Sequence, residues 1–141
     1  MHHNYKMDKG PFGNYQKYFL PAFICWVLIT GFASLAPAES FGETDFQLPH
    51  LDKVVHFLMY FILAILACGA AMSQPGFKNS DGPRMVTIYT WTALLAFLYG
   101  SFLEIMQELM DMGRHFDIWD IIANIAGTFV GIFIFAKAIK K

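Results

Sequence analysis

Four long apolar stretches alternate with shorter polar segments along this chain of 141 residues. Each stretch is close to the ~20 residues that an α-helix needs to cross the hydrocarbon core of a bilayer. The pattern therefore predicts an all-α fold, a four-helix transmembrane bundle with spans at residues 18–35, 54–72, 85–103 and 118–136. We expect a polar N-terminal tail over residues 1–17 and one membrane domain over residues 18–138.

The charged residues divide unequally between the two sides of such a bundle. If the connections alternate sides, Lys53 and Arg114 are the only lysine or arginine on one side, and all the others lie on the opposite side. By the positive-inside rule, this asymmetry predicts that both termini are cytoplasmic. Most of the acidic residues and three histidines then lie on the extracytoplasmic side, and the sequence predicts a multi-pass membrane protein.

Composition agrees with one small membrane domain. The chain is 56% hydrophobic with a mean hydropathy of +0.43, which is too apolar for an ordinary globular domain. The basic residues are spread over loops and tails, so nothing indicates binding to nucleic acid. The residues before and after the first span imitate a secretory signal peptide, but the long leader and Pro37 favour retention of this span. Cys25 and Cys68 fall within spans, which favours free thiols.

Polar residues recur at helical spacing where three of the spans reach the extracytoplasmic side. Residues three or four apart share a helix face, and this spacing joins three sets: Asp52, Lys53, His56 and Tyr60; Glu104, Gln107, Glu108 and Asp111; and Asp117, Asp120 and Asn124. Ionisable groups within membrane spans are costly, and they commonly mark functional sites. We therefore expect these three faces to converge on one outer pocket.

Each of these groups also has a purely structural interpretation. Asp117 and Asp52 suit helix N-termini, where a carboxylate accepts hydrogen bonds from free N–H groups. Glu108 and Asp111 are expected to face water or headgroups. The pair Gly127 and Gly131 indicates close helix packing. The whole polar set is also compatible with a hydrogen-bonded network that only ties the helices together.

The polar set resembles the signature of the VanZ-like family of bacterial membrane proteins, which implies a location in a bacterial inner membrane. The resemblance rests on the segment 52–61, Glu104-x-x-Gln107, and then Arg114, Asp120, Asn124 and Gly127, in that order and within a four-span layout. Asp117 departs from the family pattern and is not carried over as a site residue. The family takes its name from a protein associated with resistance to teicoplanin, and it has been grouped with membrane enzymes that act on lipid headgroups.

The resemblance implies a site made of His56, Glu104, Gln107, Arg114, Asp120 and Asn124. His56, Glu104 and Asp120 are the candidate catalytic residues, because histidine serves as nucleophile or general acid/base near neutral pH. Arg114 offers a planar cation suited to phosphate, and with it Lys53, Tyr60, Gln107 and Asn124 are the candidate substrate-binding residues.

The expected partner is a membrane lipid or a lipid-linked phosphate, and the expected reaction is hydrolysis, transfer or exchange of its headgroup. No ligand spacing requires a metal ion, although a carboxylate pair would suit Mg²⁺ or Mn²⁺. The alternative function is non-catalytic binding of a lipid, an antibiotic or a partner helix.

Overall fold

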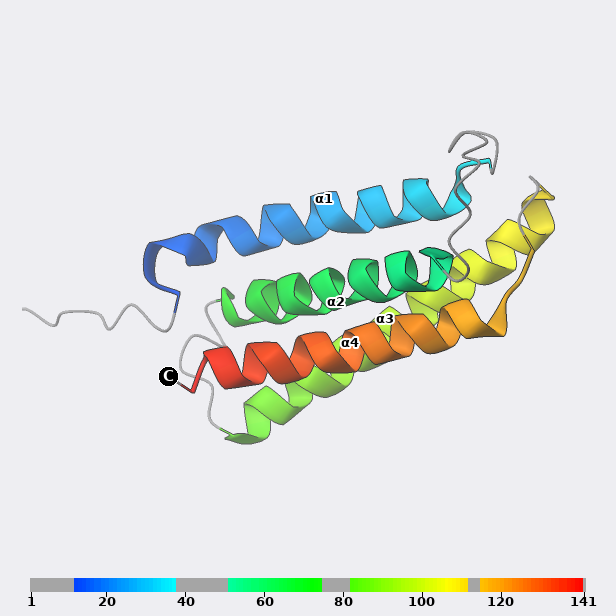
Figure 1. Ribbon diagram of the computed structural model, residues 1–141. Helices are drawn as coiled ribbons and strands as arrows, with labels where there is room; N and C mark the ends of the chain where they lie inside the picture. Colours follow the sequence, from blue (N-terminus) through cyan, green and yellow to red (C-terminus); the bar gives the residue numbers. More distant parts are fainter. Residues whose placement is uncertain (1–11, 38–50, 75–81, 112–114, 141) are drawn as a thin grey trace, which may run out of the picture.

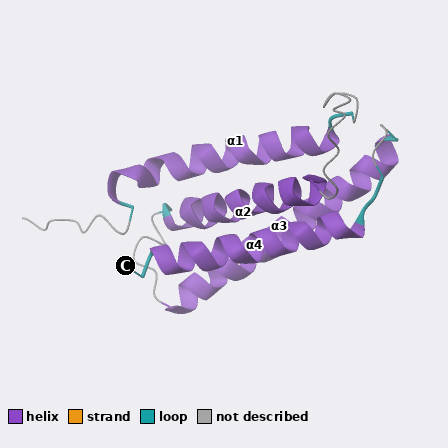
Figure 2. Cartoon of the chain, viewed as in Figure 1, coloured by secondary structure: helices purple, strands orange, loops and turns teal. Residues whose placement is uncertain are grey.

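The computed structural model describes residues 12–37, 51–74, 82–111 and 115–140, and these form an all-helical bundle (Figure 1). A short 3-10 helix, Gly13–Tyr15, leads into α1 (Gln16–Leu35), which is followed by α2 (Leu51–Met72), α3 (Gly82–Met110) and α4 (Ile118–Ala138). Figure 2 shows that helix accounts for nearly all of the described chain. All four long helices are long and apolar enough to cross a membrane, which confirms the predicted fold class.

The helices run alternately up and down, so each end of the bundle gathers two helix starts and two helix ends (Figure 1). We call one end the polar end, where α1 and α3 finish at Leu35 and Met110 while α2 and α4 begin. The other is the basic end, where α1 and α3 begin and α2 and α4 finish. The C-terminus and the start of α1 lie together at the basic end.

Close packing of α2 on α4 forms the centre of the bundle. A Cβ atom added at Gly127 would overlap the backbone carbonyl of Phe57, and one added at Gly131 would meet the carbonyl of Phe61. Only glycine permits this approach of two helix backbones, which is the usual role of small residues in membrane helix pairs. The prediction that Gly127 and Gly131 serve helix packing is confirmed.

Three hydrogen bonds attach α1 to the other helices. Trp26 Nε1 donates to the carbonyl oxygen of Met59 at 2.9 Å, Tyr99 Oη donates to that of Val27 at 2.7 Å, and Gln107 Nε2 donates to that of Ser34 at 2.7 Å. All three lie in the half of α1 nearer the polar end. In the half nearer the basic end, the Phe19 ring fills the space beside Gly69 of α2.

Large apolar side chains cover the outside of the bundle, while several polar groups are inside it. Leu28, Phe32, Leu95, Phe129 and Phe133 are among the exposed hydrophobic residues. This distribution suits a lipid solvent, in which apolar surfaces need not be hidden and polar groups must find partners within the protein.

Candidate polar site between three helices

Four polar side chains from three helices meet inside the bundle near its polar end. His56 of α2 is 5% exposed, Glu104 of α3 is 1% exposed, and Asp120 and Asn124 of α4 are 7% and 3% exposed. The i, i+4 spacing of Asp120 and Asn124 places both on the face of α4 that packs against α2. The four residues that helical phase predicts to converge are thus buried together.

His56 lies between the two buried carboxylates. Its Nδ1 is 3.1 Å from Oδ1 of Asn124 and 3.9 Å from Oε1 of Glu104, and its Nε2 is 3.8 Å from Oδ2 of Asp120. With the amide in this orientation, Asn124 Oδ1 can only accept, so the contact places a proton on Nδ1. Nε2 is then the nitrogen that gains or loses a proton, and an imidazolium would be held between two negative charges.

Lys53 joins carboxylates from two helices one turn closer to the end of the bundle. Its Nζ lies 2.7 Å from Oδ2 of Asp52, 2.6 Å from Oδ2 of Asp117 and 2.9 Å from Oδ1 of Asp120. An ammonium group has three N–H donors, and each finds one acceptor here. Asp120 contacts both Lys53 and His56, so it connects the outer ion pairs with the buried imidazole.

Asp117 has two roles at the start of α4. Its Oδ1 accepts a hydrogen bond from the backbone N–H of Trp119 at 2.8 Å, which confirms the predicted helix cap. Its other carboxylate oxygen binds Lys53. The hydrogen bond from Lys53, followed by that from the Trp119 backbone, lowers the pKa of the Asp117 carboxyl below its ordinary value.

Two glutamates of α3 hold the segment that enters α4. Glu104 Oε2 accepts from the backbone N–H of Asp117 at 3.3 Å, and Glu108 Oε2 accepts from that of Phe116 at 2.8 Å. Glu108 is also 3.7 Å from Nδ1 of the exposed His115. The buried Glu104 therefore faces His56 with one oxygen and the start of α4 with the other.

The remaining predicted site residues are placed differently. The Gln107 amide donates to the Ser34 carbonyl, so it points toward α1 and ties two helices together. Tyr60 lies one turn deeper than His56 and is buried, and its hydroxyl has no hydrogen-bond partner among the described residues. Arg114 falls outside the residues that the structure describes. Its role in phosphate binding stays a prediction.

The buried residues are also arranged as ligands for a divalent cation. One ligand atom each from His56, Glu104 and Asp120 lie within 4.8 Å of one another, and Asp52, Asp117 and Asp120 form a second such group nearer the surface. Oxygen ligands suit Mg²⁺ and Mn²⁺, and an imidazole is compatible with Mn²⁺. Lys53 already bonds all three carboxylates of the second group, so the first group fits a cation better.

Comparison with protein families gives one result, and it spans nearly the whole chain. The VanZ/LLP1 family model matches residues 11–140. The chain belongs to the VanZ/LLP1 family. Neither the curated proteins nor the solved structures gave a match. Together with its four apolar helices, membership in VanZ/LLP1 supports a multi-pass membrane protein.

Sequence reasoning placed Asp52 and Asp117 on the converging polar faces of this VanZ/LLP1 protein but did not predict their shared contact with Lys53. Both were interpreted from sequence as caps, yet both bond to Lys53. A signal was present for Asp117, because it precedes Asp120 by three residues and so shares its side of the helix start. Nothing in the sequence alone indicates that Lys53 reaches across to α4.

Proposed function

We propose that this protein acts on a lipid-linked phosphate headgroup, by hydrolysis, transfer or exchange, at the membrane face beside its polar end. The main observation behind this proposal is the buried His56 held between Glu104 and Asp120 with Nδ1 against Asn124. A titratable group in a membrane span is costly unless it has a function or a partner. Here the partners orient one ring nitrogen for proton transfer.

In the proposed reaction, His56 is the general base. Its Nε2 takes the proton from an acceptor hydroxyl, either water or a second headgroup alcohol, while that oxygen attacks phosphorus. The bond from phosphorus to the departing alcohol breaks, and the proton returns to the leaving oxygen. Asp120 stabilises the transient imidazolium from 3.8 Å, and Asn124 fixes the ring by accepting from Nδ1.

The charge balance of the site sets a condition on this reaction. Asp52, Asp117 and Asp120 take all three N–H donors of Lys53, and Glu104 adds a fourth carboxylate to the site. An anionic phosphate needs more positive charge than this. We assign that role to Arg114, whose guanidinium suits phosphate oxygens. A divalent cation at His56, Glu104 and Asp120 is the alternative source of charge.

The test is a headgroup-release assay on purified protein in mixed micelles that contain phosphatidylglycerol, phosphatidylethanolamine and undecaprenyl phosphate. Products are followed by mass spectrometry, with and without EDTA. We expect His56→Ala to lower turnover by at least ~100-fold, the lower range for loss of a general base. His115→Ala is the matched control, because His115 is 77% exposed and pairs only with Glu108 among the described residues. This control should keep wild-type turnover.

Lipid binding separates the enzyme from a passive binder. His56→Ala should retain co-purified lipid if His56 acts in chemistry, whereas Arg114→Ala should lose the anionic headgroup. If the wild type turns over none of the three lipids but retains bound lipid, the enzyme proposal is rejected in favour of a lipid-binding protein. Equal turnover by wild type and His56→Ala would refute the role of His56.

A further inference from the structure

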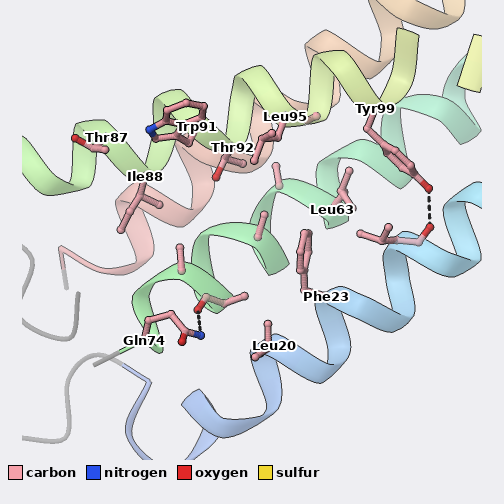
Figure 3. A pocket seen from close by; sticks show the side chains of 16 residues that line it. Leu20, Phe23, Leu63, Gln74, Thr87, Ile88, Trp91, Thr92, Leu95 and Tyr99 are labelled. Carbon is pink, nitrogen blue, oxygen red and sulfur yellow. Dashed lines mark hydrogen bonds between the residues drawn. The ribbon is translucent and has the colours of Figure 1, made fainter. Parts of the chain in front are cut away.

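A large apolar groove lies between α1 and α3, away from the polar site. Its volume is about 570 Å³, and α2 forms its floor. Figure 3 shows Leu20 and Phe23 of α1 on one side and Ile88, Trp91 and Leu95 of α3 on the other. Small residues of α2, including Ala64, Ala67 and Ala71, leave the space between these walls open.

The groove is closed on the side that faces the polar end of the bundle. Polar residues line its opposite end, which faces the basic end of the bundle. The Tyr99 hydroxyl donates to the Val27 carbonyl and bridges the two walls (Figure 3). At the opposite end the lining includes Gln74 and Thr87. From Thr87 to Tyr99, α3 rises about 18 Å at 1.5 Å per residue. This is close to half of the ~30 Å hydrocarbon core, the depth of one leaflet.

Basic residues lie next to the end of the groove that Gln74 and Thr87 line, which is at the basic end of the bundle. Lys17 lies three residues before Leu20 on α1, and Arg84 lies three residues before Thr87 on α3, so each shares a helix face with a lining residue. Both side chains are exposed. An exposed cation at the membrane surface attracts anionic lipid headgroups.

We propose that this groove binds one hydrocarbon chain of an anionic phospholipid from the leaflet at the basic end, with its phosphate beside Lys17 and Arg84. The depth of the groove, its apolar lining and the charges at its mouth each match one part of such a lipid. The Tyr99 bridge separates this site from His56, so the bound lipid is not the substrate of the polar site. The two proposals therefore stand or fall independently.

The proposed binding of a hydrocarbon chain is tested by filling the groove. Ala67→Phe places a ring in the open space above α2, and Ala126→Phe makes the same change on the exposed face of α4. After delipidation, the protein is titrated with phosphatidylglycerol and bound lipids are counted by native mass spectrometry. We expect Ala67→Phe to weaken binding of the tightest lipid by at least tenfold and Ala126→Phe to leave it unchanged. Ala71→Leu serves as a milder second filling variant if Ala67→Phe does not fold.

The proposed contact with the phosphate headgroup is tested by changing the charge of the lipid and the charge of the protein. We expect phosphatidylglycerol to bind about 25-fold more tightly than phosphatidylcholine with the same chains, because each of the two basic residues near the surface strengthens binding about fivefold. The double change Lys17→Gln and Arg84→Gln should abolish this preference, whereas Lys137→Gln, at the same end on α4, should preserve it. If Ala67→Phe binds the tightest lipid as strongly as the wild type does, the groove site is refuted. Wild-type binding without preference for the anionic lipid would refute the headgroup assignment.

Discussion

Asp120 is the residue on which the polar site depends most, because it contacts both Lys53 and His56. One of its oxygens is 2.9 Å from Lys53 Nζ, and the other is 3.8 Å from His56 Nε2. A change in the charge of Lys53 or His56 therefore alters the electrostatic environment of the other residue through the single carboxylate of Asp120. Lys53 thus acts on His56 indirectly, as a positioning residue.

The ion pair of Asp117 with Lys53 predicts an acid-sensitive contribution to stability. Because the pKa of Asp117 is lower in the folded protein than in the unfolded chain, its contribution is complete well above the ordinary value of 3.8 and is lost as the pH falls through the lowered pKa. We expect Asp117→Asn to cost about 0.5–1 kcal/mol at pH 7, a modest figure because the side chain is 35% exposed. The difference from wild type should shrink as the pH falls below 3.8 and vanish once the pH is below the lowered pKa.

Thermal unfolding in detergent across this pH range measures the effect. Asp111→Asn is the matched control, since it removes an exposed carboxylate directly after α3 and keeps a residue type that tolerates the positive φ of 47° at this position. A pH-independent loss in Asp117→Asn would show that the ion pair with Lys53 is not its cause, because asparagine caps a helix as well as aspartate does.

The polar site could be predicted from sequence in its membership and only partly in its contacts. Helical phase brings His56, Glu104, Asp120 and Asn124 together, and all four are buried. The same reasoning placed Gln107 in the pocket, but its amide bonds to α1. Helical spacing in the sequence shows which side chains share one face of each helix. The rotation of that face toward one neighbour or another follows from packing between helices, which no single helix encodes.

At the scale of helices, the glycine contact between α2 and α4 brings two helix backbones close together. Gly127→Ala would force a methyl group onto the Phe57 carbonyl, and backbone cannot yield as a flexible side chain does. We expect a loss of about 2–4 kcal/mol in reversible unfolding by SDS, typical of overpacking at a rigid site. Gly82→Ala meets nothing within 4 Å and should be neutral or slightly stabilising. Equal behaviour of the two variants would contradict this packing.

The helix boundaries show where hydropathy informs and where it does not. The predicted starts and ends of the first, second and fourth spans lie within three residues of the observed helices. The third span was predicted to end at Leu103, whereas α3 continues to Met110. Hydropathy falls at Glu104 because polar side chains begin there. Backbone hydrogen bonds need no apolar side chain, so the helix continues and presents Glu104 to the site and Gln107 to α1.

For the whole molecule, orientation in the membrane is a prediction that rests on charge. The positive-inside rule places the basic end in the cytoplasm and the polar site on the extracytoplasmic side. A single cysteine introduced at Asp111 should then react with a membrane-impermeant maleimide in intact cells, while one at Gln74 should react only after lysis. Both are made in a Cys25→Ser, Cys68→Ala background, because the native thiols lie within α1 and α2. The reverse labelling pattern would invert the topology.

The packing of α4 on α2 also has a consequence for biogenesis. During synthesis α2 emerges before α4, so Lys53 reaches the membrane surface before its partners Asp117 and Asp120 exist in the chain. The same holds for His56, whose neighbours Asn124 and Asp120 belong to the last helix. A nascent chain that has inserted only three helices lacks the α4 partners of Lys53 and His56, and the face of α2 that packs against Gly127 and Gly131 is open. The final helix must therefore be complete before the polar site can form.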